Sequence, residues 1–407
     1  MTDNDANRRL PFAGLLVLDC ATFIAAPFTA AILAEFGAEV IKVEAPGTGD
    51  PLRKFGTPTA RGGDTLAFLS EARNKTSITL DLRKPAGADL FKRLAAQADI
   101  VCENFRPGTL DRWGLSYEEL SRRNRGLIML HVSGYGQSGP YCDRPGFARI
   151  AHAVSGLTHL AGLPGGPPVT PGSTSLADYM SGLYGVIGVL AALRHRDATG
   201  EGQEIDVALY EPAFRVLDEL APAFAASGRV RGREGLGTVN ACPHGHFQCG
   251  GDGKWVAIAC TSDKMFERLA AVMGRPELAA PDRFRTTRQR LDHRAEVDGI
   301  VAAWLGGLTR DEAVRLCVEG EVPCGPINDI ADIFADPHYR ARDNLVALDD
   351  PALGAVTVPG VVPKLSKTPG EIRTLGPALG NGNDAVYRDR LGLGDDELAA
   401  LKAAGVI

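Results

Sequence analysis

The chain has 407 residues, of which 44% are hydrophobic and 23% charged, and its formal net charge is −6. This length exceeds what one compact core normally supports, so the sequence predicts a globular protein of two domains. The negative charge disfavours nucleic acid or an anionic membrane as the main partner. The first ten residues are polar and lack an apolar signal core, so we expect a cytoplasmic protein that is not secreted.

The first half of the chain alternates β-rich runs with helical patterns. Strands are predicted at 15–18, 40–43, 78–80, 100–102 and 127–132, and helices at 29–36, 85–98 and 116–123. Ser116 and Glu119 have the spacing of a capping box at the start of the last helix. Strand–helix alternation at this spacing predicts an α/β fold with a doubly wound, parallel sheet.

The amino-acid composition changes near Gly228, where a basic, glycine-rich stretch begins. A hairpin is predicted around 251–253, helices at 262–273 and 297–305, and a second capping box at Thr309 and Glu312. The remaining 326–407 contains an extended run at 356–358 and a terminal helix. We therefore expect a large domain in 1–227, a smaller α+β domain in 228–325 and a C-terminal segment in 326–407.

Cysteine usage argues for reduced thiols, because eight cysteines are scattered through a long acidic chain. Cys242, His244, His246 and Cys249 are close enough in sequence to be considered as zinc ligands. Their spacing matches no standard finger or ribbon, so no metal site is predicted. The apolar run 183–193 is too short for a membrane span and is interpreted as a buried core helix.

Asp178 stands just ahead of this long helical pattern, in the sequence Ser-Leu-Ala-Asp-Tyr-Met-Ser-Gly. An aspartate there is most often an ordinary N-cap. The position also suits a nucleophile, because the helix dipole favours an ionised, outward-facing carboxylate.

The motifs around Asp178 indicate which interpretation applies. They include Gly14–Asp19, Phe36–Glu44, Asn74–Leu82, Glu103–Gly108, Gly134–Pro140 and Val322–Asn328. In this order the motifs resemble the family III CoA-transferases, a group that also contains α-methylacyl-CoA racemases. The resemblance covers almost the whole chain. It implies a Rossmann-like large domain built from both chain ends, and two subunits interlocked as a homodimer.

The resemblance implies that Asp178 is the catalytic residue and carries CoA as a covalent aspartyl thioester. No permanently bound cofactor is implied; CoA thioesters and carboxylic acids are the expected substrates. By alignment with the family, the CoA contacts fall at Ile24, Ala25, Leu80, Arg83, Asn104, Phe105, Arg106, Arg112, Arg144 and Phe147. Arg83 and Arg112 are the expected phosphate ligands.

A racemase is the main alternative, since it requires paired acid and base groups to move an α-proton. Phe147 stands where the family's racemases have a histidine base, and His152 and His159 lie out of register. A nicotinamide oxidoreductase is disfavoured because no G-x-G-x-x-G follows the first strand. A non-catalytic subunit working with a related partner chain is a further alternative.

The resemblance extends to a dicarboxylate branch, which includes succinyl-CoA:malate or citramalate transferases and mesaconyl-CoA C1–C4 transferases. Ile24, Phe147 and Ala148 replace polar groups typical of formyl-CoA:oxalate transferase, so formate and oxalate are not expected. Arg149 is the candidate cation for the free carboxylate of a dicarboxylic acid.

Overall fold

The structure, a computed structural model, describes residues 10–172 and 174–407. These residues form two compact units. The first unit comprises residues up to Leu157 together with Gly172–Asp218 and Tyr339–Ile407; the second comprises Thr158–Pro171 and Glu219–His338. The second unit is therefore wider than the 228–325 expected for the small domain, and the C-terminal segment joins the first unit only from Tyr339 onward.

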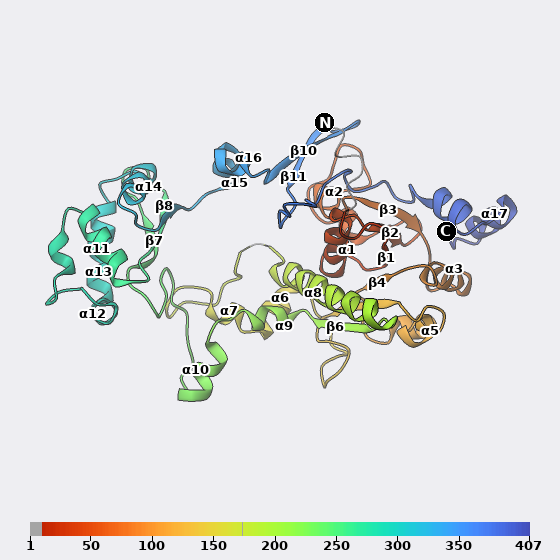
Figure 1. Cartoon of the computed structure of the whole chain (residues 1–407), viewed down its shortest axis with the longest axis horizontal. Helices are drawn as coiled ribbons and strands as arrows, with labels where there is room; N and C mark the ends of the chain where they lie inside the picture. The colour runs from red at the N-terminus through yellow and green to blue at the C-terminus, as the bar shows by residue number, and fades with distance from the viewer. Residues whose placement is uncertain (1–9, 173) are drawn as a thin grey trace. The chain divides into compact units, whose positions relative to one another are not determined.

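The first unit is built on a six-stranded parallel sheet (Figure 1) with the order β3-β2-β1-β4-β5-β6. The strands are β1 (Leu16–Asp19), β2 (Glu39–Glu44), β3 (Lys75–Thr79), β4 (Ile100–Glu103), β5 (Ile128–Ser133) and β6 (Glu204–Ala208). This order is that of a Rossmann fold, in which the chain reverses direction across the sheet between β1 and β4. The predicted α/β class and doubly wound parallel sheet are confirmed.

Helices of the first unit connect and cover these strands. They are α1 (Ala25–Glu35), α2 (Leu66–Glu71), α3 (Pro85–Ala95), α4 (Thr109–Arg112), α5 (Tyr117–Ser121), α6 (Ala148–Val154), α8 (Leu176–Thr199), α9 (Tyr210–Arg215) and α17 (Asp395–Ala403). A hairpin of β10 (Leu345–Asp350) and β11 (Gly354–Pro359) precedes α17. Short helical turns occur at Pro51–Lys54 and Ala385–Arg390.

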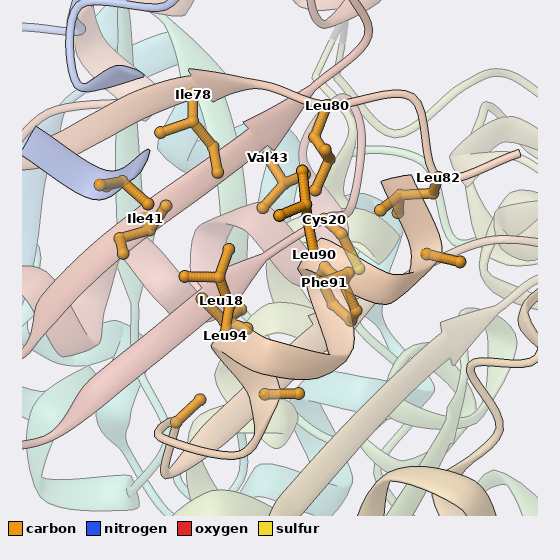
Figure 2. Packing of buried hydrophobic residues seen from close by; sticks show 14 of the residues in the cluster. Leu18, Cys20, Ile41, Val43, Ile78, Leu80, Leu82, Leu90, Phe91 and Leu94 are labelled. Carbon is orange, nitrogen blue, oxygen red and sulfur yellow. The ribbon is translucent and has the colours of Figure 1, made fainter. Parts of the chain in front are cut away.

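Each face of the parallel sheet carries its own apolar layer. Figure 2 shows one of them, where Leu90, Phe91 and Leu94 of α3 pack on Leu18 and Ile41. The C-terminal residues Tyr387 and Ile407 belong to the same layer. The Tyr387 hydroxyl donates to the Thr79 carbonyl over 2.6 Å, so the chain end is held against strand β3.

The opposite face is covered by α1 and α8, which pack closely on each other. Any Cβ at Gly182 would lie 2.8 Å from the Ala25 carbonyl oxygen, and one at Gly185 would lie 2.5 Å from Thr29 Oγ1. Only glycine permits this approach, since real Cβ contacts are longer. The two glycines thereby bring the second and third turns of α8 against the first two turns of α1.

Helix α8 is longer and less buried than the sequence suggested. It has 24 residues, and among the described residues it is the one helix long and apolar enough to span a membrane. It packs against α1, β5 and β6, but Leu183 and Ile187 on its outer face are 50% and 58% exposed. The interpretation as a short, buried core helix is therefore wrong for this face.

The second unit has a three-stranded antiparallel sheet with the order β7-β8-β9. Its strands are β7 (His244–Gln248), β8 (Trp255–Ala259) and β9 (Cys324–Pro326), and its helices include α10 (Leu220–Ser227), α11 (Asp263–Val272), α12 (Thr287–Asp292), α13 (Arg294–Leu305), α14 (Arg310–Glu319) and α15 (Ile330–Ala335). A short helix also lies at Pro276–Ala279, and the short helices Leu157–Leu160 and Pro337–Ala341 contain the positions in sequence where the chain passes from one unit to the other. The predicted hairpin and the capping box of Thr309 and Glu312 are confirmed.

Candidate functional site

A pocket of about 220 Å³ lies in the first unit, at the carboxyl ends of the parallel strands. Thr22–Ala25 follow β1, Asn104–Pro107 follow β4, and Ser133 ends β5; all of them line it. Since β1 and β4 are the strands between which the sheet reverses its winding, this is where open α/β sheets bind ligands. Its size suits a small acid or one end of a larger ligand.

The pocket brings together eight of the twelve residues predicted from the sequence. They are Ile24, Ala25, Asn104, Phe105, Arg106, Arg144, Phe147 and Asp178. Pocket residues that the sequence reasoning missed include Thr22, Phe23, Pro107, Ser133, Gly134, Cys142 and Leu209. Most of these follow a strand end, so the rule that ligands bind at strand carboxyl ends would have indicated them.

Four predicted residues do not line this pocket. Leu80 is 2% exposed and packs within the core shown in Figure 2. The exposed Arg83 donates to Asp81 from Nε over 2.8 Å, and Arg112 donates to Thr109 Oγ1 over 2.9 Å. Arg149 is exposed in the first turn of α6. Contacts from these residues to a ligand stay predictions.

Asp178 lies inside the first turn of α8, not ahead of it. The helix begins at Leu176, and Ser175 stands at the N-cap position. Burial raises the pKa of Asp178 to about 6, against a smaller lowering by the Ser175 hydroxyl. A carboxylate with that pKa is ionised at neutral pH and protonated in mild acid.

The cations of the pocket are Arg106 and Arg144, both exposed. The guanidinium of Arg144 stacks on the Tyr141 ring, 3.6 Å from its centroid. Together with the N-terminus of α1 at Ala25, these side chains give the pocket positive charge around a single carboxylate, Asp178. The arrangement can hold an anionic ligand against a nucleophile.

Phe23 adopts a left-handed backbone conformation with φ of 60°, which is costly for a residue with a Cβ. Its N–H donates to Asp50 Oδ1 over 3.0 Å, and its ring meets Phe147 and Phe55 edge to face at 6.1 and 6.0 Å between centroids. The loop is therefore held in a strained shape at the pocket wall, with an aromatic cluster above it.

Asn104 holds the same loop from the other side. Its Oδ1 accepts from Thr22 N–H over 2.8 Å, and its Nδ2 donates to the Thr22 carbonyl over 2.7 Å. Both polar atoms of the Asn104 amide thus bond to the backbone, so Asn104 shapes the pocket wall. Its direct contact with CoA stays a prediction.

Replacing Asn104 with Ala should weaken the binding of the CoA thioester, because the strained Phe23 turn loses both of these bonds. We expect an increase in KM of about tenfold, corresponding to roughly 1.4 kcal/mol. Steady-state kinetics would check this value. The half-buried Asn344 does not line the pocket and offers a partial control, since Asn344→Ala should leave KM unchanged.

The cysteine–histidine cluster of the second unit is distributed over a hairpin. Cys242 and Cys249 are buried, and the Cys242 thiol lies 3.5 Å from Asp298 Oδ1. Throughout residues 10–172 and 174–407, no group of three or more His, Cys, Asp or Glu side chains is placed to hold a metal ion.

The fold and the pocket define an α/β protein in which the Asp178 carboxylate, a candidate nucleophile, lies among positively charged groups. The model of the CoA-transferase family III matches residues 12–383, so the chain belongs to this family and is a CoA-transferase. CoA thioesters are accordingly its substrates.

Named relatives cover nearly the whole chain. It is 58% identical to the succinyl-CoA–L-malate CoA-transferase beta subunit of Chloroflexus aurantiacus over 98% of both chains. The alpha subunit from that organism is 54% identical over 100% of this chain and 95% of its own length. A succinyl-CoA–D-citramalate CoA-transferase of the same organism is 43% identical over 98% of each.

A solved structure gives the same picture of the fold. The CaiB/BaiF family protein of Brucella suis superposes with a TM-score of 0.83 at 34% identity, over 94% of this chain and 100% of the other.

Proposed function

We propose that this enzyme moves CoA between small dicarboxylic acids, with succinyl-CoA as donor and a hydroxy acid such as malate or citramalate as acceptor. The names of its relatives support this choice of substrates. The observation that carries the chemistry is the position of Asp178 in a pocket with two arginines and a helix N-terminus.

In the proposed reaction the Asp178 carboxylate attacks the donor thioester carbonyl, and the carbon–sulfur bond breaks to give a mixed anhydride and CoA thiolate. The thiolate then attacks the aspartyl carbonyl of the anhydride. This step forms an aspartyl-CoA thioester and releases the donor carboxylate. The acceptor carboxylate repeats both steps in reverse, so atoms and charges balance.

The residues of the pocket supply what these steps require. A carboxylate is a weak nucleophile, so holding thioester and acid side by side must provide much of the acceleration. Partial burial of Asp178 removes water from its carboxylate, which makes it more reactive. Arg106 and Arg144 are suited to bind phosphate or carboxylate groups of the ligands.

A mass-spectrometric screen of CoA esters tests the proposal. Succinyl-CoA would be mixed separately with malate, citramalate, mesaconate, itaconate, glutarate and acetate, and mesaconyl-C1-CoA would be incubated alone. A new CoA ester that Asp178→Ala does not produce supports transfer and names the acid. Migration of CoA within mesaconyl-CoA would indicate the intramolecular reaction instead.

An acyl-CoA racemase is the second candidate function. Phe147 lines the pocket at the position where the family's racemases have their base. Phenylalanine cannot move a proton, which disfavours racemisation. Deuterium entering the α-position of an acyl-CoA from solvent, without any transfer, would reverse this order.

Two arginines, Arg149 and Arg144, are candidates for binding the free carboxylate of a dicarboxylic acid, and kinetics can distinguish them. If Arg149 binds it, Arg149→Ala should raise KM about tenfold or more for a dicarboxylic acid and little for acetate. Arg144 lines the pocket and serves as the matched comparison. The same selective increase in Arg144→Ala alone would transfer the role to Arg144, and equal increases for both acids would contradict carboxylate recognition by either residue.

We also propose that the active form is a dimer, either of two copies or with a related partner chain. The exposed Leu183, Ile187 and Leu190 on α8 support an association that covers this face. The alpha and beta subunits named among the relatives support a partner of similar sequence. The eight free thiols support a reducing, cytoplasmic location.

A further inference from the structure

His152 lies on α6 and contacts the start of α8. Its side chain is buried, with 1% of the residue exposed, and Nε2 accepts a hydrogen bond from the Ala177 N–H over 3.0 Å. Ala177 directly precedes Asp178. The N-cap residue Ser175 makes no side-chain capping bond, so the imidazole satisfies an N–H that a local cap would normally satisfy.

This bond determines the tautomer of His152. Because Nε2 accepts, the proton of the neutral ring must be on Nδ1. Nδ1 is buried and has no hydrogen-bond partner among the described residues. An unpaired buried donor is destabilising, so the histidine is held here at a cost to stability.

We infer that His152 is a positioning residue for Asp178, whose neutral imidazole fixes the first turn of α8 so that the carboxylate faces the pocket. This inference rests on the proposed role of Asp178 as the carrier of CoA. His152 lies outside the pocket lining and acts through the backbone of Ala177.

Protonation of His152 would break the arrangement, since Nε2–H would then point at the Ala177 N–H. Burial and the charge of Arg149 both lower the pKa of His152, which keeps the ring neutral at physiological pH. Helix α6 packs against α8, which carries Asp178 and Tyr179, and against α9, which carries Glu211 and Arg215. Acid should therefore switch off transfer through two groups, Asp178 and His152.

Two variants of His152 separate positioning from simple packing. His152→Leu fills the site without an acceptor, whereas the amide oxygen of His152→Gln can still accept from Ala177 N–H. We expect kcat to fall 10- to 100-fold in His152→Leu, with KM for the CoA thioester changed less than about twofold. His152→Gln should recover kcat to within about threefold, and the exposed His159→Leu serves as control.

The pH profile and the tautomer give independent measurements. The acid limb of log kcat against pH should have a limiting slope of two in the natural enzyme and one in His152→Gln. Nuclear magnetic resonance of ¹⁵N-histidine-labelled protein should show His152 protonated at Nδ1 only, a result that does not depend on activity.

The inference would be overturned by a natural kcat in His152→Leu, by an equal loss of kcat in the Gln variant, or by a proton on Nε2. If His152→Leu does not fold, His152→Gln and the tautomer decide. Asp178→Asn is measured in parallel. Full activity of Asp178→Asn would contradict the proposed function, whereas an inactive Asp178→Asn beside a fully active His152→Leu would contradict only the role of His152.

Discussion

Asp178→Asn should reduce CoA transfer by at least about a thousandfold, because an amide cannot attack a thioester and the covalent route is lost. In the natural enzyme, incubation with succinyl-CoA should add to the peptide containing Asp178 the mass of CoA less one water. The variant should show no such adduct. Asp197→Asn, an exposed aspartate on the same helix, is the matched control and should retain full activity.

The same substitution should stabilise the protein above pH 6. Burial raises the pKa of Asp178 from 3.8 to about 6, so the folded state binds more protons than the unfolded state between these values. The free energy of unfolding therefore falls by no more than roughly 3 kcal/mol as pH rises from 4 to 6, and it stays at the lower value above pH 6. An asparagine carries no charge and avoids this cost. The melting temperature of the Asp178→Asn variant should exceed that of the natural enzyme by a few degrees at pH 8 and match it near pH 4.

A pH-independent difference in melting temperature would contradict the assignment of a raised pKa to Asp178. The kinetic counterpart is an acid limb of kcat/KM with an apparent pKa close to 6 for this group. A limb centred near 4 would mean that Asp178 is solvated in the working enzyme.

Asp19→Leu should produce the largest loss of stability. Asp19 is fully buried at the end of β1, and Oδ2 lies 2.8 Å from Lys75 Nζ and 3.5 Å from Lys42 Nζ. Although burial alone would raise its pKa, the two lysines hold the pKa of Asp19 below its ordinary value. Removing the carboxylate leaves the Lys75 ammonium buried without a countercharge, at a cost of about 3–5 kcal/mol.

Denaturant unfolding of four proteins measures this cost: the natural chain, Asp19→Leu, Lys75→Met and the double variant. If the charges of Asp19 and Lys75 compensate each other, the double variant leaves neither of them unpaired, so it should be more stable than Asp19→Leu alone. Strict additivity of the two single losses would contradict the pairing. As a control, Glu118→Ala removes the exposed ion pair between Glu118 of α5 and Arg122 and should change stability by less than about 1 kcal/mol.

The network around Asp19 also reaches the pocket. Lys75 Nζ donates to the Pro27 carbonyl in α1, and Lys42 Nζ lies 2.7 Å from Asp50 Oδ2. Asp50 in turn accepts from the strained Phe23 N–H. Loss of Asp19 should therefore disturb catalysis as well as stability, whereas an exposed pair should affect neither.

Local pattern was sufficient for five of the six strands of the parallel sheet and for the family. The apolar runs 100–102 and 127–132 became β4 and β5, because a strand buried on both faces is mostly apolar. The motifs around Asp178 identified the CoA-transferase family, and eight predicted residues meet in one pocket.

Tertiary structure decided what depends on distant neighbours. The strained backbone of Phe23 and the backbone role of Asn104 could not be predicted, because their hydrogen-bond partners are 27 and 82 positions away. The same holds for His152, which caps a helix 25 positions further along the chain. The amino-acid sequence by itself determined most strands of the parallel sheet and the family, since these follow from local spacing. Burial of Asp178, and hence its pKa, emerged only when α6, α8 and α1 packed together, because desolvation depends on the atoms that surround a group in space.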